Sequence, residues 1–308
     1  VRTHFDAAKF VDGAAPPSVN PSLWRHAQLN AQIGLFKVTD GLYQLRGFDI
    51  GNMTIVEGKT GWIVIDALTA KETAAAALAF ARKHLGDKPV TALVFSHSHI
   101  DHFGGALGVI SPEEAVARKV PIVASAGFME EATSENVMVG TAMGRRSFYQ
   151  FGKELERSPK GLVDTGLGKA VGYGSFGILP PTVLVTQPTE EMALDGVRFV
   201  FHNVPGAGAP AEMTFSIPAL KAYGGAENLA QTMHNLLPVR GAKVRDALKW
   251  AEYMQQAIDQ LDGAEVYFGQ HNWPVWGHQR IVDFITKHRD VYKYTHDQTV
   301  RLINAGLT

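Results

Sequence analysis

Residues 96–102 read Ser-His-Ser-His-Ile-Asp-His and follow an apolar run, Val90–Phe95, that predicts a buried strand. The stretch brings three imidazoles and one carboxylate to a loop at the carboxyl end of that strand, where α/β folds place ligand-binding residues. Neutral imidazole and carboxylate suit zinc and other borderline divalent ions. The competing interpretation is a polar loop with chance histidines. With only 12 His in 308 residues, this spacing rarely arises by chance.

The bulk composition is that of an ordinary globular protein. The chain has 308 residues, of which 45% are hydrophobic and 19% charged, enough for one large core or two modest domains. A net charge of −1 excludes a basic field for nucleic acid, and no polybasic stretch favours a membrane surface. No run of about 18 apolar residues predicts a membrane span. The absence of cysteine excludes disulfides and thiolate ligands.

Short β-rich runs and helices alternate along most of the chain. Residues 1–34, with their Pro-rich stretch, are predicted to be an irregular lead-in. Residues 35–308 are predicted to form one domain that ends in a helical tail over about 275–308, broken near Asp290. We predict strands at 36–39, 42–45, 53–56, 62–65, 90–95, 182–186, 197–203, 213–217, 220–223 and 265–268, and helices at 70–85, 113–118, 127–137 and 244–261. This order favours an α/β fold of two β-rich halves stacked face to face, with helices outside.

Residues 147–177 contain seven glycines and are predicted to form a long loop over one face. No Gly-Lys-Ser/Thr triplet occurs there, so the stretch is not a phosphate-binding loop. A loop this long inside a compact domain is usually functional or mobile.

The histidine cluster can start two metal sites. His97 and His99 lie two apart on an extended segment, so their side chains can project to one side and chelate one ion. Asp101 and His102 face a neighbouring position and can begin a second site. Each zinc ion needs about four ligands, so we expect the remaining ligands to come from the ends of other strands on the same face.

Three downstream residues are candidates for these ligands. Glu227 follows the predicted strand 220–223, and its carboxylate could bridge two cations; alternatively it is a helix N-terminal Glu stabilised by the macrodipole. His271 follows the predicted strand 265–268 and is either a ligand or a structural histidine. His202 lies inside a strand, which favours a half-buried structural histidine.

Together these motifs resemble the metallo-β-lactamase superfamily, and more narrowly its alkyl sulfatase branch, from about Val19 to the end of the chain. The His97–His102 cluster alone indicates only the superfamily, and further blocks indicate the branch. These blocks are Val19–Trp24, Gly58–Trp62, Phe103–Gly105, Ala209–Met213, Ala226–Asn228, His234–Leu236, Arg240–Ala242 and His271–Pro274.

The resemblance implies an αββα sandwich of the metallo-β-lactamase type with a two-zinc site. It implies that His97 and His99 bind the first zinc, that Asp101, His102 and His271 bind the second, and that Glu227 bridges them, with Asp101 and Glu227 as the catalytic residues. It also implies that Asn235 and Arg240 bind the sulfate oxygens. A guanidinium presents a planar fork of donors to an oxyanion, although without the resemblance Arg240 would be interpreted as a surface residue.

Gly208 departs from the pattern of the branch. Members usually have a Thr-Glu pair before the Ala-Pro-Ala-Glu block, and that Glu binds the first zinc. Here the stretch 205–210 reads Pro-Gly-Ala-Gly-Ala-Pro, so Gly208 stands where the ligand is expected. Water could replace the ligand, Glu212 could move in, or the first site could be weakened or empty. The first site is therefore expected to be incomplete, while the fold should survive.

The function we expect is zinc-dependent hydrolysis of a small-molecule alkyl sulfate ester. The segment Phe128–Phe151 is a candidate wall for an alkyl groove, although core packing explains its Met and Phe residues equally well. One alternative is another hydrolase on the same scaffold, acting on a β-lactam, lactone, thioester or phosphoester, because a fold does not fix a substrate. The other is a non-catalytic relative, because of Gly208.

The resemblance also bears on location and assembly. Members of the branch are often exported, which favours a periplasmic or secreted protein, although Val1–Asp6 shows no signal peptide. Full-length relatives continue into a helical dimerisation region, so this chain is expected to be the catalytic domain, with a dimer expected only of the longer form.

Overall fold

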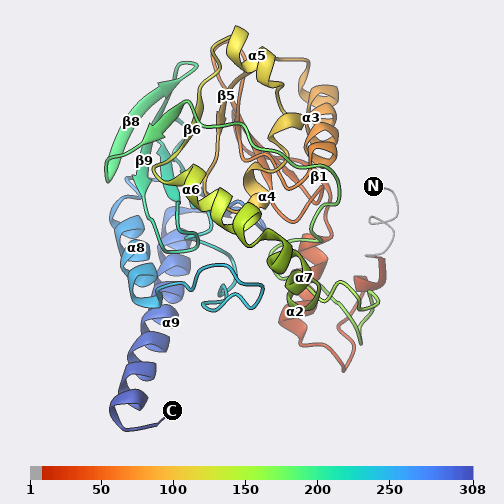
Figure 1. Cartoon of the computed structure of the whole chain (residues 1–308), viewed down its shortest axis with the longest axis vertical. Helices are drawn as coiled ribbons and strands as arrows, with labels where there is room; N and C mark the ends of the chain where they lie inside the picture. Colours follow the sequence, from red (N-terminus) through yellow and green to blue (C-terminus); the bar gives the residue numbers. More distant parts are fainter. Residues whose placement is uncertain (1–8, 308) are drawn as a thin grey trace.

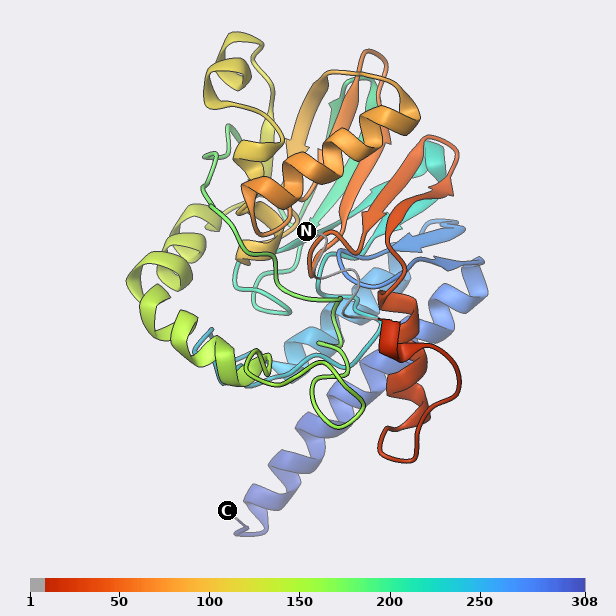
Figure 2. The ribbon, with the colours of Figure 1, turned by 90° about the vertical axis from the view of Figure 1, so that its right-hand side faces the viewer.

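Two β-sheets packed face to face form the centre of the computed structural model, which describes residues 9–307 (Figure 1). Helices cover the outer face of each sheet. In Figure 2, α3 (Lys71–Leu85) lies across the first sheet, while the long α9 (His278–Asn304) extends beyond the body of the molecule. Val1–Asp6, on which the expectation about a signal peptide rests, lie outside the described residues.

The first sheet has seven strands in the order of the sequence. Its first four strands pair antiparallel and the next three continue in parallel. The strands are β1 (Gly34–Thr39), β2 (Leu42–Arg46), β3 (Met53–Glu57), β4 (Trp62–Ile65), β5 (Val90–Val94), β6 (Ile122–Ser125) and β7 (Val183–Val185).

The second sheet has six strands in the order β13-β12-β11-β10-β9-β8. All neighbours pair antiparallel except β11 and β12, which are parallel. The strands are β8 (Thr189–Leu194), β9 (Val197–Asn203), β10 (Met213–Ile217), β11 (Ala222–Gly224), β12 (Val266–Phe268) and β13 (Val275–Trp276). Neither β8 nor β13 was predicted from the sequence pattern.

The remaining elements are helices and short helical turns. No helix among residues 9–307 is both long and apolar enough to cross a bilayer. Besides α3 and α9, these elements are η1 (Lys9–Val11), α2 (Pro21–Asn30), α4 (Ile100–Phe103), η2 (Ala106–Gly108), α5 (Pro112–Ala117), α6 (Phe128–Thr133), η3 (Ser134–Met138), α7 (Gly140–Gln150), η4 (Pro218–Leu220) and α8 (Ala247–Asp259).

Three large apolar clusters separate the layers. One lies between the first sheet and α3, with Ala74, Ala77 and Leu78 of that helix fully buried. A second fills the space between the sheets, where Phe199, Phe201 and Phe215 meet the inner face of the first sheet. The third packs α8 and α9 against the second sheet. The layers therefore run helix, sheet, sheet, helix, which confirms the predicted αββα sandwich.

Three boundaries differ from the sequence-based expectations. The lead-in is not wholly irregular, because Asn20 caps α2 by accepting a hydrogen bond from the Ser22 amide at 2.8 Å. The tail begins with a strand, β13, and α9 then runs without a break through Asp290, because Ile285 and Tyr292 on either side of it are both buried in the third cluster. The glycine-rich loop begins only after Gln150, since α7 occupies the preceding residues.

Candidate active site

The candidate ligands follow the ends of strands that meet at one edge of the sandwich. The predicted cluster follows β5, and α4 begins inside it, at Ile100. Glu227 follows β11 and His271 follows β12, its parallel neighbour. Because parallel strands end at the same edge, three separate segments reach one place. His97 also forms an isolated β-bridge with Glu212, which joins the loop after β5 to the second sheet.

His97, His99 and Glu227 form the first of two donor clusters. One carboxylate oxygen, Oε2 of Glu227, lies 2.8 Å from Nε2 of His97 and 2.5 Å from Nδ1 of His99. All three side chains are buried. The structure thus brings together the two imidazoles and the carboxylate that the sequence suggested for the first ion, and we call them cluster 1.

Asp101, His102 and His271 form cluster 2. Nε2 of His102 lies 3.1 Å from Oδ2 of Asp101 and 3.2 Å from Nε2 of His271, and the third edge, His271 Nε2 to Asp101 Oδ2, measures 3.4 Å. Nδ1 of His271 lies 3.0 Å from the carbonyl oxygen of Ile50, so its Nε2 is the nitrogen left to bind an ion. These are the donors that zinc accepts in proteins.

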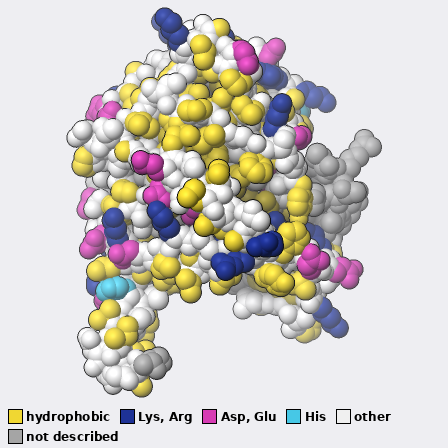
Figure 3. Space-filling view, viewed as in Figure 1, with side chains coloured by type: hydrophobic (Ala, Val, Ile, Leu, Met, Phe, Trp, Pro, Cys, Tyr) yellow, Lys and Arg dark blue, Asp and Glu magenta, His cyan; other side chains and the backbone are white. Residues whose placement is uncertain are grey.

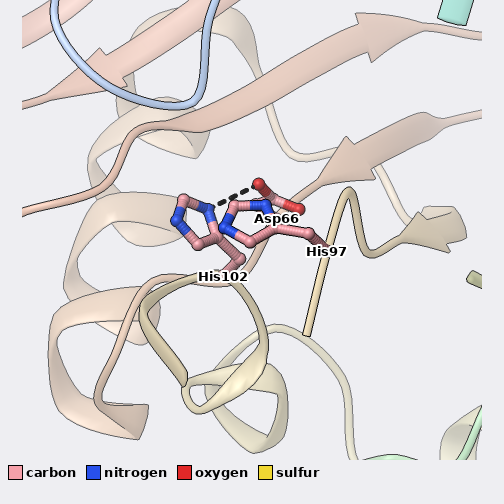
Figure 4. Close-up of side chains that lie close together, drawn as sticks. All are labelled: Asp66, His97 and His102. Atoms are coloured by element: carbon pink, nitrogen blue, oxygen red, sulfur yellow. Dashed lines mark hydrogen bonds and ion pairs between the residues drawn. The ribbon is translucent and has the colours of Figure 1, made fainter. Parts of the chain in front are cut away.

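Asp66 contacts His102 of cluster 2 on the ring nitrogen that faces away from the other donors, and it was not predicted from the sequence. Its Oδ2 lies 2.7 Å from Nδ1 of His102 (Figure 4). The amide of Ser96 donates to Oδ1 of Asp66, and the Ser96 hydroxyl donates to Oδ2. A carboxylate on the far nitrogen of a metal-binding histidine fixes the tautomer and orientation of the ring. The available signal was an acidic residue directly after the apolar strand β4.

The histidines of the two clusters differ in their electrostatics. Burial lowers the pKa of His97 to about 3 and of His99 to about 4, so both rings are neutral at pH 7, as a metal ligand must be. Burial also disfavours charge on His102, but the carboxylates of Asp101 and Asp66 outweigh it and raise the pKa of His102 well above 6.5. The same negative field favours a bound cation.

Glu227 is ionised, and residues outside the expected ligand set lie against its second oxygen. Burial opposes its charge, but His99, His234 and His97 hold its pKa well below 4.5. His234 Nε2 contacts Oε1 of Glu227, while its Nδ1 lies 3.0 Å from Nη1 of Arg245. A guanidinium only donates, so Nδ1 of His234 accepts and its Nε2 carries the proton that faces Glu227.

Arg245 ties together the loops around cluster 1. Its Nε donates to the carbonyl of Gly208 at 2.6 Å, and its Nη1 donates to Asn235 at the backbone oxygen (2.7 Å) and at Oδ1 (2.9 Å). Nη2 lies 3.9 Å from Oε1 of Glu227. The buried guanidinium therefore places a positive charge beside cluster 1.

Gly208 lies where the backbone leaves no room for a side chain. A Cβ built there would stand 2.9 Å from Cβ of Glu227 and 3.0 Å from Oε2 of Glu212. Glu212 does not join the donors, because its carboxylate accepts hydrogen bonds from the amides of Ala209, Glu227 and Asn228. Among the described residues, neither Gly208 nor Glu212 adds a ligand to cluster 1.

Glu135 is a further acidic side chain near cluster 1. It is buried in η3, a π-helical turn between α6 and α7, with Oε2 at 4.0 Å from Nε2 of His99. Burial raises its pKa. Single π turns within helices frequently occur at functional sites. The sequence pattern predicted only an ordinary helix here.

The two donor clusters lie in the wall of a cavity of about 780 Å³. His99, Asp101 and Glu227 line it, and so do Asn235 and Arg240. The remaining walls come from α7, from the glycine-rich loop and from residues 232–239. Apolar side chains and Lys or Arg side chains lie next to one another across the face that carries α6 and α7 (Figure 3). The volume falls in the usual range for small-molecule sites.

His202 does not belong to the site. It lies in β9 with Nδ1 at 3.1 Å from the Thr189 hydroxyl and its ring stacked beside Tyr223. This agrees with its interpretation as a structural histidine.

A model of the metallo-beta-lactamase superfamily matches residues 46–210, more than half of the chain. The chain belongs to the metallo-β-lactamase superfamily. It is similar to the alkyl/aryl-sulfatase BDS1 of Saccharomyces cerevisiae (46% identity, 97% of this chain, 47% of that protein). It is also similar to an (R)-specific secondary-alkylsulfatase of Pseudomonas sp. (45% identity, 96% of this chain, 45% of that protein). The resemblance to the superfamily that the sequence motifs indicated is thus confirmed, and these relatives support its alkyl sulfatase branch.

Solved structures agree with this membership. The stereoselective inverting sec-alkylsulfatase Pisa1 from Pseudomonas sp. superimposes with a TM-score of 0.95 at 45% identity, over 99% of this chain and 48% of that one. A metallo-β-lactamase from Hirschia baltica, at 13% identity and a TM-score of 0.56 over 83% of this chain and 97% of that one, shares the fold alone. The chain spans about half the length of its alkylsulfatase relatives.

Proposed function

We propose that this chain hydrolyses alkyl sulfate esters with the help of bound zinc, and that residues 35–308 are its catalytic domain. The support from similarity is the group of alkylsulfatase relatives, each matched over nearly the whole of this chain. The observation that carries the proposal is the meeting of two donor clusters and a guanidinium in one cavity with apolar walls.

The donors fit zinc in kind. Neutral imidazoles and carboxylates are its usual nitrogen and oxygen ligands, and Asp66 and Ile50 hold two of the rings through their other nitrogens. Cluster 1 and cluster 2 would each hold an ion, with Asp101 and Glu227 as the catalytic carboxylates. Zinc, when bound, makes hydroxide available at neutral pH and offsets charge on the sulfate.

Arg240 and Asn235 are the proposed sulfate-binding residues. Arg240 lines the cavity and its charge acts on both His99 and Glu135, so its guanidinium is close to cluster 1. Asn235 lines the same wall, and its Oδ1 is held by Arg245, which leaves the amide NH₂ free to donate. Two donors of this kind match the oxygens of a sulfate monoester.

The cavity walls supply an apolar environment for an alkyl chain. Met143 and Phe151, from α7 and the residue after it, line one side, and Leu167 and Val171 of the glycine-rich loop line another. The loop is fastened at Gly172, whose amide donates to Asp49 at 2.7 Å. The sequence suggested that the segment Phe128–Phe151 forms a wall of an alkyl groove. We propose this role for the second half of the segment, which lines the cavity.

The test is a substrate panel on the purified chain. Linear and secondary alkyl sulfates, a β-lactam, a lactone, a thioester and a phosphoester are offered separately to the zinc-loaded protein. We expect release of sulfate and alcohol from at least one alkyl sulfate. Turnover of another ester or of the lactam, with none of any sulfate, would contradict the proposal, and so would inertness toward the whole panel.

A further inference from the structure

We infer that the two donor clusters bind metal unequally, so that cluster 2 fills first and tightly, and cluster 1 fills only at much higher metal concentration. This inference rests on the proposed metal-dependent function and adds an order of filling that belongs to this chain. Three features of the described residues support it: the donor spacing, the fixed charges around each cluster, and the backbone at Gly208.

The donor spacing already suits an ion at cluster 2. Zinc with ligand distances near 2.0–2.1 Å in a tetrahedron needs its donor atoms about 3.3 Å apart. The three edges of cluster 2 measure 3.1, 3.2 and 3.4 Å. In cluster 1, the carboxylate oxygen lies only 2.8 and 2.5 Å from the two imidazole nitrogens, well short of that spacing. Cluster 1 must therefore open further than cluster 2 before it can hold an ion.

The fixed charges favour a cation at cluster 2. Asp101 is one of its donors, and Asp66 lies directly behind His102, with Ser96 and His102 as its hydrogen-bond partners in the described part of the chain. Two carboxylates therefore face an ion that would bind there in place of the His102 proton. The buried position of Asp66 keeps water from screening this attraction.

The charges at cluster 1 oppose a second cation. Its one carboxylate, Glu227, is already paired on Oε1 with His234 and faces Arg245 at 3.9 Å. Arg245 and Arg240 both act electrostatically on His99. A dication at cluster 1 would meet the carboxylate of Glu227, with Glu135 beyond His99, and two nearby guanidinium groups, a less favourable balance than at cluster 2.

Gly208 has no side chain that could add a further donor to cluster 1. Both clusters offer three donors, one fewer than a closed zinc site requires, but the carboxylate of cluster 1 is shared with His234. The backbone at Gly208 packs against Glu227 too closely for a side chain to enter without displacing it. Since losing even an outer partner of a ligand costs about 10–100-fold in affinity, we expect cluster 1 to be at least about 100-fold weaker than cluster 2.

The test is zinc stoichiometry, measured without reference to turnover. The chain is stripped with a chelator and then titrated with zinc in the presence of a chromophoric competitor, while elemental analysis counts the ions that remain after dialysis. We expect one tight ion per chain and a second that is at least about 100-fold weaker. Two ions of equal affinity would overturn the inference.

Matched variants locate the tight ion. Asp101→Asn keeps the size of a partly exposed side chain and should abolish the tight ion, as should His271→Asn. His99→Asn, in cluster 1, should leave it bound. Thermal unfolding of each metal-free variant checks that it folds. A tight ion that survives both cluster 2 variants, or that His99→Asn removes, would contradict the assignment.

The outcomes separate this inference from the proposed function. One tight ion at cluster 2 in a chain that cleaves no alkyl sulfate would leave the order of filling intact and defeat the function. Two equally tight ions in a chain that releases sulfate would do the opposite.

Discussion

Nδ1 of His99 and Oε2 of Glu227 lie 2.5 Å apart, although 128 positions separate the two residues along the chain. His99 follows β5 of the first sheet and Glu227 follows β11 of the second, so this contact crosses the sandwich. The candidate active site therefore depends on how the two sheets are placed, and substitutions that disturb the packing near this edge should affect metal binding as well as stability.

Asp66→Asn should weaken metal binding at cluster 2. The substitution keeps the shape of the side chain but removes the carboxylate that orients His102 at 2.7 Å. We expect zinc affinity to fall about 10–100-fold, the usual cost of losing such a partner. Competition with a chromophoric chelator measures it. Asp40→Asn, at an exposed residue remote from the cavity, is the control, and equal affinities in the two variants would refute the role of Asp66.

Arg240→Ala should impair the use of alkyl sulfates. Hydrogen bonds to a charged group contribute about 1.5–3 kcal/mol, so kcat/KM should fall about 10–100-fold, mostly through a higher KM. Steady-state kinetics on one alkyl sulfate measures this. Arg145→Ala removes an exposed arginine of α7 that does not line the cavity and should leave kcat/KM unchanged. If the two variants behave alike, Arg240 is not a sulfate-binding residue.

Gly105→Ala should destabilise the fold where the metal-binding loop meets the first sheet. A Cβ at this position would lie 2.1 Å from the carbonyl oxygen of Ala67 and 2.7 Å from that of Ala70. Overpacking of this kind costs about 1–3 kcal/mol in the free energy of unfolding. Denaturant titration of the metal-free protein measures the change.

The control is Gly144→Ala in α7, where no heavy atom lies within 4 Å of the new Cβ. Because glycine inside a helix is unfavourable relative to alanine by roughly 0.5–1 kcal/mol, this variant should be neutral or slightly more stable. A Gly105→Ala variant as stable as Gly144→Ala would mean that the loop can shift at little cost.

His202 should make the fold sensitive to acid. Burial lowers the pKa of His202 below 6.5, so the folded chain binds fewer protons than the unfolded chain once the pH falls below that value. The stability from the neutral ring is full above pH 6.5 and declines as the pH falls through it. His202→Gln should therefore lose less stability between pH 7.5 and 5.5 than the parent does, in parallel denaturant titrations. Equal losses would show that the ring does not contribute.

The layers, and the meeting of the six candidate ligands at one edge, were predictable from the sequence for a local reason. Each of the six lies on the loop that follows an apolar run, and short apolar runs mark strands whose ends meet at one edge. The residues that act on them were harder to predict. Asp66 directly follows the apolar strand β4, but its role, like those of His234 and Arg245, depends on distances that no spacing along the chain encodes.

The missed boundaries also have physical causes. The break expected near Asp290 does not occur because an apolar stripe on α9 continues past it and packs on α8. The two-residue strand β13 is too short to show an alternating pattern and depends on pairing with β12. In both places tertiary contacts, and not local sequence preference, set the outcome.

Sulfate release from an alkyl sulfate, by the chain before and after zinc removal, tests the central claim most directly. The account predicts that the zinc-loaded chain releases sulfate, that the chelator-stripped chain does not, and that added zinc restores the reaction. Undiminished release by the stripped chain, or no release at any zinc concentration, would contradict it.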